Sequence, residues 1–311
     1  MTTSTFPGRL ARSLRQSLSL VLTAGALLAQ AQTTAPVEGT LDKIRTSGKV
    51  VLGVREASPP MAYALGANER FVGYHVELCE RVLKDIAPKA RLEYMALTAQ
   101  NTLPLVSNGT VDIGCGPTTN NLARQQQVAF ALTTYVSEVR MAVRADSGIT
   151  SVSQLAGRTV AATTGTTAVQ LLRKLERAQN LTLKTSLGKD HLESFLILES
   201  GRADAFVLDD NLLAGIIANS KTPQAWRIVG EPLGSEPIAL LFRKDDPAFK
   251  AAVDGSIRAL MKSGELERLY AKWFLEPIPP RQTPLNLSMS TALRQLLANP
   301  NDLPLESYAA R

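Results

Sequence analysis

Residues 112–124, with the sequence DIGCGPTTNNLAR, predict a buried strand that turns into a helix at an anion site. Val111 to Ile113 has the apolar character of a strand end, and the two glycines that follow allow another backbone to approach closely. Thr118 to Asn121 supplies side chains that cap helix N-termini, where free N–H groups favour anions. Arg124 would lie about one and a half turns along this helix and fold back beside a carboxylate. The alternative is an ordinary capped turn with a solvated arginine.

Short apolar strands alternate with amphipathic helices along the rest of the chain. Strands are expected at 50–54, 91–96, 159–163, near Leu181 and at 205–208, and helices at 74–86, 101–107 and 168–179. This order predicts an α/β protein with parallel strands and right-handed crossovers, divided into two lobes. Two further extended runs, 134–143 and 234–242, are expected to cross between the lobes and form a hinge.

The N-terminus has the features of a secretory signal peptide. Three arginines within residues 9–15 precede an uncharged stretch from Leu18 to Leu28, and Ala29-Gln30-Ala31 supplies small residues for cleavage after Ala31. The apolar stretch is shorter than the roughly 20 residues that span a bilayer, and no second apolar stretch of that length follows. We therefore expect a soluble mature protein in the periplasm.

Composition agrees with a compact globular protein. At 311 residues with 45% hydrophobic content, the chain is long enough to bury the cores of two lobes. The net charge is +6 and the pI about 9.4, but part of that charge lies in the signal peptide. No run of basic residues and no alternation of basic and aromatic residues follows, so we expect a solvated surface and no nucleic-acid partner. We also expect a monomer.

Cys79 and Cys115 are the only cysteines of the chain. Cys79 is expected on a helix face and Cys115 at a strand end, which favours two separate buried thiols. A disulfide bond between them is the alternative that an oxidising compartment permits.

A series of short motifs recurs in order from about Leu41 to Pro280. They are REAS at 55–58, QN at 100–101, CGPTTNN at 115–121, RQ at 124–125, GTT at 165–167, KDH at 189–191, LESGRA at 198–203, DD at 209–210 and KWF at 272–274. In these motifs the chain resembles the periplasmic amino-acid-binding proteins of ABC importers, bacterial solute-binding protein family 3, and in particular their glutamate/aspartate-binding subgroup. The resemblance implies a type II periplasmic binding fold, with two α/β lobes joined by a two-strand hinge and a ligand between them.

This fold implies a division of the chain in which one lobe is built from two separate segments. The expected parts are a signal peptide at 1–31, lobe 1 at 32–138 and 237–285, lobe 2 at 139–236, and a C-terminal tail at 286–311 whose order stays open. The implied partners are a small-molecule amino acid and the permease subunits of an ABC transporter.

The resemblance also implies which residues bind the ligand. Thr119 and Arg124 would bind the α-carboxylate of an amino acid, assisted by Thr166 or Thr167 of the second lobe. Asp209 would pair with the α-ammonium group.

A second cluster holds the side-chain carboxylate in the acidic-amino-acid subgroup, and Arg55 and His191 match two of its members. Ala99 and Thr102 stand where that subgroup usually has a serine and an arginine, and Pro117 stands where it has a serine. The first two changes remove a hydroxyl and a charge from the far end of the pocket. The exact ligand therefore stays open.

Charge favours an acidic ligand. Arg55, Arg124 and a protonated His191 would oppose only Asp209, and a buried excess of charge is unfavourable unless the ligand offsets it. Glutamate or aspartate is therefore expected to bind better than glutamine or asparagine.

Each of these residues also has a purely structural interpretation. Asp209 and Asp210 can be an acidic pair at a helix N-terminus. His191 can be a structural hydrogen-bonding group, and His75 is expected to be only that. Arg55 can be solvated at the end of its strand, although strand carboxyl ends are where open α/β sheets bind ligands.

Catalytic and cofactor signatures are absent from the sequence, which lacks GxSxG, CxxC, HExxH and P-loop patterns. We therefore expect no catalytic residues, no metal ligands and no cofactor. The alternative in the enzyme class is a periplasmic cyclohexadienyl (arogenate/prephenate) dehydratase on the same fold, with His191 and Glu193 transferring protons. A ligand-sensing module that docks on a membrane receptor is the third possibility.

Overall fold

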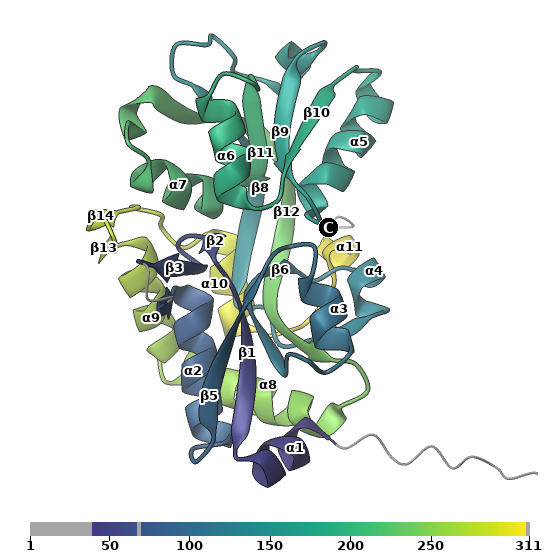
Figure 1. The fold of residues 1–311 in the computed structure, drawn as a ribbon, viewed down its shortest axis with the longest axis vertical. Helices are drawn as coiled ribbons and strands as arrows, with labels where there is room; N and C mark the ends of the chain where they lie inside the picture. The colour runs from purple at the N-terminus through teal and green to yellow at the C-terminus, as the bar shows by residue number, and fades with distance from the viewer. Residues whose placement is uncertain (1–38, 67–69, 309–311) are drawn as a thin grey trace, which may run out of the picture. The chain divides into compact units, whose positions relative to one another are not determined.

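Runs of apolar and β-branched residues form one large sheet in this computed structural model, which describes residues 39–66 and 70–308 (Figure 1). The predicted signal peptide at 1–31 lies outside the described residues. Within the described residues the sheet has nine strands in the order β10–β9–β11–β8–β12–β6–β1–β5, with β7 also paired to β12. Their bounds in that order are Lys184–Gly188, Thr159–Thr163, Ala205–Asp209, Tyr135–Arg144, Trp226–Arg243, Ile113–Thr119, Lys49–Arg55 and Arg91–Leu97, with β7 at Val128–Phe130.

Two groups of parallel strands lie on either side of two long antiparallel strands. We call the group in which β1 pairs with β5 and β6 lobe 1, and the group in which β9 pairs with β10 and β11 lobe 2. Between them, β8 pairs with β11 and with β12, and β12 pairs with β6 (Figure 1). The prediction of two α/β lobes joined by two crossing strands is therefore confirmed.

Helices cover the strands of both lobes. Lobe 1 carries α1 (Thr40–Ser47), α2 (Tyr74–Ile86), α3 (Thr102–Ser107), α4 (Leu122–Gln125), α8 (Pro247–Lys262) and α9 (Glu265–Phe274), and lobe 2 carries α5 (Thr167–Gln179), α6 (His191–Glu199) and α7 (Asp210–Asn219). Two short 3₁₀ helices lie at Val152–Leu155 and Pro223–Ala225, and a small sheet is formed by β2 (Ala57–Ser58), β3 (Ala62–Leu65) and β4 (Arg70–Val72). No helix among the described residues is long and apolar enough to cross a membrane.

The predicted helix at 74–86 is present with both of its ends as expected. Its buried side chains include His75, Cys79, Val82 and Leu83, which recur at helical spacing on the face that packs against β6. The helix begins after its N-cap, Gly73, and ends at its C-cap, Ala87, whose backbone N–H donates to the carbonyl oxygen of Leu83.

The predicted turn within residues 112–124 is wrong, because β6 continues through it to Thr119. A Cβ atom on Gly114 would lie 2.5 Å from Leu241 Cδ2, and one on Gly116 would lie 2.8 Å from Arg55 Cγ. The glycines therefore allow close packing inside the sheet and do not make a turn. The helix that follows, α4, has only four residues and begins after its N-cap, Asn121.

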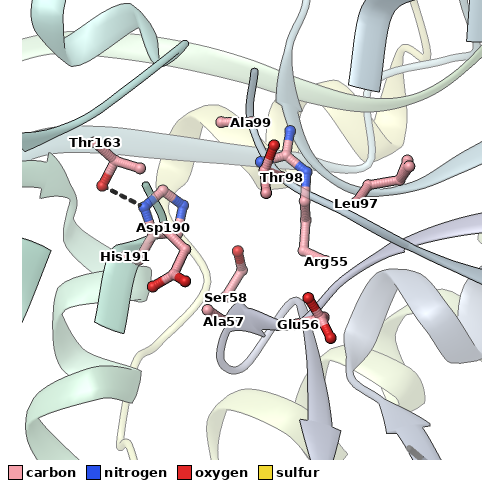
Figure 2. A pocket seen from close by; sticks show the side chains of 10 residues that line it. All are labelled: Arg55, Glu56, Ala57, Ser58, Leu97, Thr98, Ala99, Thr163, Asp190 and His191. Carbon is pink, nitrogen blue, oxygen red and sulfur yellow. Dashed lines mark hydrogen bonds between the residues drawn. The ribbon is translucent and has the colours of Figure 1, made fainter. Parts of the chain in front are cut away.

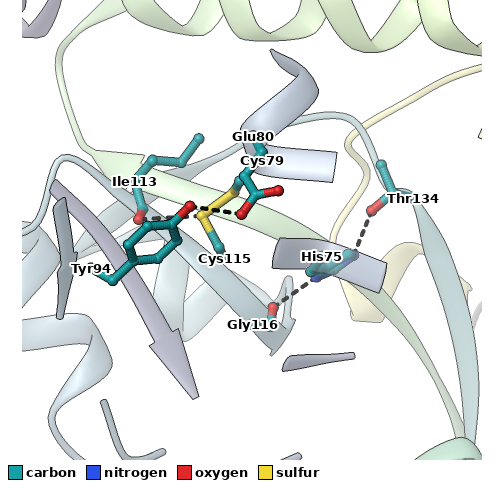
Figure 3. The surroundings of a disulfide bond; sticks show 8 residues. All are labelled: His75, Cys79, Glu80, Tyr94, Ile113, Cys115, Gly116 and Thr134. Atoms are coloured by element: carbon teal, nitrogen blue, oxygen red, sulfur yellow. Dashed lines mark hydrogen bonds between the residues drawn. A yellow bond between two sulfur atoms is a disulfide. The ribbon is translucent and has the colours of Figure 1, made fainter. Parts of the chain in front are cut away.

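The prediction of two separate thiols is also wrong, since Cys79 and Cys115 form a disulfide bond (Figure 3). Because β6 extends past its predicted end, Cys115 lies within the strand and faces the helix that carries Cys79. Their Cα atoms are 6.0 Å apart, a separation that a disulfide spans readily.

The strand expected near Leu181 begins three residues later, at Lys184. Asn180 ends α5 in the left-handed conformation, and the chain needs the next residues to turn back to the sheet.

The C-terminal tail is regular in the described residues. It contains α10 (Thr291–Ala298) and α11 (Leu305–Tyr308), and it follows a two-stranded ribbon of β13 (Pro277–Ile278) and β14 (Thr283–Pro284).

Three of the predicted binding residues end strands of the large sheet. Arg55 is the last residue of β1, Thr119 of β6 and Asp209 of β11. Carboxyl ends of strands are where ligands bind in open α/β sheets, so the fold brings these side chains to one region.

Candidate ligand-binding site

A small cavity lies between the two lobes at the carboxyl ends of their strands. It is lined by Arg55, Glu56, Ala57, Ser58, Leu97, Thr98, Ala99, Thr163, Asp190 and His191 (Figure 2). Its volume of about 20 Å³ is room for about one water molecule. An amino acid is far larger, so the lobes must separate to admit one.

Arg55 and His191 lie on either side of this cavity (Figure 2). Arg55 is only 7% exposed, and burial together with the nearby charge of Arg124 lowers its pKa to about 9, against the opposing effect of Asp209. Among the described residues it takes part in no ion pair and no hydrogen bond. Its interpretation as a solvated arginine is therefore wrong, and it is a buried cation beside a cavity.

His191 begins α6, and its Nδ1 lies 2.9 Å from the Thr163 hydroxyl. Burial and the charge of Arg55 lower its pKa to about 3. The imidazole is therefore neutral near pH 7, and the expectation of a protonated His191 is wrong. His191 both lines the cavity and makes a structural hydrogen bond.

His75 has only the structural role predicted for it. Its ring nitrogens lie 2.9 Å from the Gly116 carbonyl oxygen and 2.8 Å from the Thr134 hydroxyl (Figure 3).

A second cluster surrounds Arg124 between the lobes. Its guanidinium donates to the carbonyl oxygen of Thr119 at 3.0 Å and to that of Gly165, in lobe 2, at 3.4 Å. Arg124 thus folds back beside Thr119 as predicted, although from a single-turn helix. Burial lowers its pKa, and the charges of Glu236 and Asp209 oppose that effect.

Glu236 is the residue of this cluster that the sequence analysis missed. It lies in β12, is only 3% exposed, and its Oε2 accepts hydrogen bonds from the hydroxyls of Thr119 at 2.5 Å and Thr167 at 2.9 Å. A signal was present, because Glu236 is an acid directly before the apolar run 237–242 of a predicted hinge strand. It joins a strand of lobe 1 to a helix of lobe 2.

The hydrogen bonds to Glu236 limit what the two threonines can do. A hydroxyl has a single proton to donate, and in this state Thr119 and Thr167 both donate it to Glu236. Their hydroxyls can therefore donate to a ligand carboxylate only if their hydrogen bonds to Glu236 break. Thr166 is not an alternative, because its hydroxyl donates to the carbonyl oxygen of Thr163 at 2.7 Å.

The structure separates the roles of Asp209 and Asp210. Asp210 accepts from the backbone N–H groups of Asn211 at 2.8 Å and Glu138 at 3.1 Å, so it is the acid at the helix N-terminus. Asp209 makes no capping bond and instead accepts from the Ser137 hydroxyl at 2.5 Å. Burial and the charge of Glu236 raise the pKa of Asp209 to about 7.

Of the three altered positions, one lines the cavity. Ala99 lines it, whereas Thr102 and Pro117 do not. The Thr102 hydroxyl is buried and donates to the carbonyl oxygen of Thr98 at 2.7 Å.

The proton-transfer pair of the dehydratase alternative is not assembled. Glu193 does not line the cavity, and its carboxylate accepts from the backbone N–H of Lys189 at 2.9 Å. Among the described residues, no cluster of side chains suited to hold a metal ion is present.

The lobes touch at two glycines. A Cβ atom on Gly215 of α7 would lie 2.3 Å from the carbonyl oxygen of Pro59, and one on Gly165 would lie 2.7 Å from the Cα atom of Gln100. Both contacts join lobe 2 to lobe 1. The structure is therefore a closed state in which the absence of two side chains lets the lobes meet.

Two lobes on a two-strand hinge, closing over the buried side chains of Arg55 and Glu236, define the class of type II periplasmic binding proteins. Within that class the chain belongs to the bacterial extracellular solute-binding proteins, family 3, whose model matches residues 50–276.

Individual relatives agree with this assignment. The chain is 40% identical to the glutamate/aspartate import solute-binding protein of Escherichia coli K12, over 93% of its own length and 96% of that protein. It is 39% identical to the L-glutamate/L-aspartate-binding protein of Pseudomonas aeruginosa, over 94% and 99% of the two lengths. A crystal structure of a cysteine-binding protein from Campylobacter jejuni matches with a TM-score of 0.68 and 27% identity, covering 76% of this chain and 93% of that one. The relatives named above are solute-binding proteins, which confirms the expected class.

Proposed function

We propose that this chain captures glutamate or aspartate and delivers it to the permease of an ABC transporter. Relatives at 40% and 39% identity carry names for these two amino acids. The observation that carries the proposal is Arg55, a buried guanidinium without a partner among the described residues, beside the cavity. A buried unpaired charge is strongly unfavourable, and a ligand side-chain carboxylate would pair with it.

The charge argument from the sequence needs correction. Glu236 is a second buried acid, and His191 is neutral, so two arginines face two carboxyl groups and no simple positive excess exists. Position decides instead, because Glu236 binds the threonines beside Arg124, whereas Arg55 lines the small cavity together with His191 and Ala99. An anion is thus favoured at the Arg55 end.

The ligand would be bound at both ends. Its α-carboxylate would meet Arg124, its α-ammonium would meet Asp209, and its side-chain carboxylate would meet Arg55 and the neutral imidazole of His191. We propose that residues 139–236 move as lobe 2 relative to 32–138 and 237–285, with β8 and β12 as the hinge. Binding shifts the population toward the closed state because the contacts come from both lobes.

The proposed setting is the periplasm, reached through a signal peptide at 1–31 that is cleaved after Ala31, and the protein would act as a monomer. The import function in the name of the Escherichia coli relative supports a permease partner.

Calorimetric titration of residues 32–311 with glutamate, aspartate, glutamine and asparagine tests the proposal. We expect each acid to bind more tightly than its amide. Tighter binding of either amide would show that the Arg55 end is not a carboxylate site.

A further inference from the structure

The last described part of the chain contacts the predicted carboxylate-binding segment. We call residues 300–308, which include α11, the C-terminal strap, and residues 119–124 the clamp segment. The strap lies outside the 50–276 region matched by the family model. It is anchored elsewhere in lobe 1, where Thr133 donates its backbone N–H to Asn301 at 3.0 Å and Lys250 pairs with Asp302 at 2.8 Å.

Asn120, in the middle of the clamp segment, is fully buried and held on several sides. Its side-chain NH₂ donates to the backbone carbonyl oxygen of Asp302 at 2.8 Å. Its backbone carbonyl oxygen accepts from the backbone N–H of Leu305 at 2.8 Å. Its remaining groups bond to Gln125 and to the hinge residue Pro237, each at 2.8 Å. The strap therefore supplies two of the partners that fix Asn120.

The helix that carries Arg124 depends on similar help. α4 has four residues, and a helix that short is not stable by itself. Asn121 accepts from the Arg124 backbone N–H at 2.8 Å, and the Glu306 carboxylate of the strap accepts from the Leu122 N–H at 3.0 Å. A negative charge at a helix N-terminus stabilises it, so Glu306 completes the capping of α4.

The strap also borders the opening between the lobes. A cavity of about 450 Å³ is lined by Leu305, Glu306 and Tyr308 of the strap and also by Thr167 and Glu236. The strap thus lies beside the carboxylate cluster and not on a remote surface.

We propose that the C-terminal strap is a positioning element that holds the clamp segment, and with it Arg124, in the geometry that binds the ligand α-carboxylate. The proposal rests on the proposed function, since it takes the clamp segment as the α-carboxylate site. Without the strap, Asn120 loses two partners and α4 loses a capping acid, so Arg124 samples other orientations before the ligand binds.

Leu305→Pro removes one N–H donor and tests this directly. Leu305 is the first residue of α11, where proline is compatible with a helix, and Leu305→Ala is the matched control that keeps the N–H. Glu306→Ala removes the capping acid from an exposed position, and Glu267→Ala, an exposed acid in the first turn of α9, is its control.

Hydrogen exchange of residues 119–126 in the ligand-free protein and calorimetric affinity for glutamate are the two readouts. For Leu305→Pro and Glu306→Ala we expect faster exchange in this segment and about three- to tenfold weaker binding, as for the loss of one hydrogen bond. Neither control should change either readout.

Three results would overturn the proposal: unchanged exchange, faster exchange with unchanged affinity, or equal losses for Leu305→Pro and Leu305→Ala. Wild-type protein that binds no amino acid would instead overturn the proposed function. The exchange data would then still decide whether the strap orders the clamp segment.

Discussion

The hydroxyl of Thr119 donates to the carboxylate of Glu236, so a predicted donor to the ligand carboxylate is already bonded to an acid of the protein. Glu236 receives a second hydroxyl from Thr167, across the two lobes. The α-carboxylate end of the site therefore contains its own anion. Arg124, and not the threonines, is left as the group that can bind a ligand carboxylate in this closed state.

Binding is expected to depend on pH through the Asp209 carboxyl group. Burial and Glu236 raise the pKa of Asp209 to about 7, so below that pH Asp209 becomes neutral and cannot pair with an ammonium group. Affinity for glutamate should fall below pH 7, by up to about tenfold for each unit. Calorimetry between about pH 5.5 and 8.5 measures this.

Glu236→Gln is expected to move this fall to lower pH, because it removes a charge that raises the Asp209 pKa. Glutarate, which lacks the ammonium group, serves as the control and should not show the same dependence. A midpoint that stays in place in Glu236→Gln would mean that the two acids are not coupled.

Arg124→Ala should weaken binding of glutamate by about 30-fold to several thousand-fold, corresponding to about 2–5 kcal/mol. The change leaves the ligand carboxylate unpaired in a closed, dry cleft. Arg124 loses only its hydrogen bonds to the carbonyl oxygens of Thr119 and Gly165, so the melting temperature without ligand should change little. Affinity equal to wild type would remove Arg124 from the site.

Arg55→Met should stabilise the ligand-free protein while it weakens glutamate binding. The substitution replaces a buried unpaired cation with an apolar side chain of similar length. We expect a higher melting temperature and loss of the preference for glutamate over glutamine. Arg45→Met, at an arginine with 76% side-chain exposure that pairs with Asp42, is the control and should affect neither property.

Gly215→Ala should oppose closure. The added Cβ atom would lie 2.3 Å from the Pro59 carbonyl oxygen, which the open state avoids. Affinity should drop, and scattering should show a smaller decrease in radius of gyration with saturating ligand than in wild type.

Gly255→Ala is the matched control for that experiment, because an added Cβ atom there meets no heavy atom within 4 Å. It should raise stability by roughly 0.8–1.0 kcal/mol through helix propensity and leave binding unchanged. Equal affinities of the two variants would contradict closure at Gly215.

The helix 74–86 and the two hinge strands could be predicted from the sequence because their apolar patterns are local and regular. Residues 112–124 predict a strand-to-helix turn because Thr118 to Asn121 are helix-capping types, whereas β6 continues to Thr119 and its glycines pack closely against Leu241 and Arg55. The disulfide bond was missed as a consequence. Tertiary packing overrides local preference at these positions.

For the site, the structure brings five of the residues predicted from motif positions to one inter-lobe region: Arg55, Thr119, Arg124, Asp209 and His191. Their roles as ligand contacts stay predictions. Glu236 could not be found in this way, because its function arises only where β12 passes between Thr119 and Thr167. The protonation of His191 likewise depends on burial and on Arg55, which sequence spacing does not give.

The disulfide bond between Cys79 and Cys115 cross-links lobe 1 only. It closes a loop with a sequence separation of 36 that includes β5 and α3, and cross-links of that size stabilise a fold by about 4 kcal/mol. Both cysteines of the chain are used in lobe 1, so lobe 2 has no such bond. In a reducing compartment lobe 1 alone would lose this stabilisation, and a newly made chain would stay easier to unfold until it reached an oxidising environment.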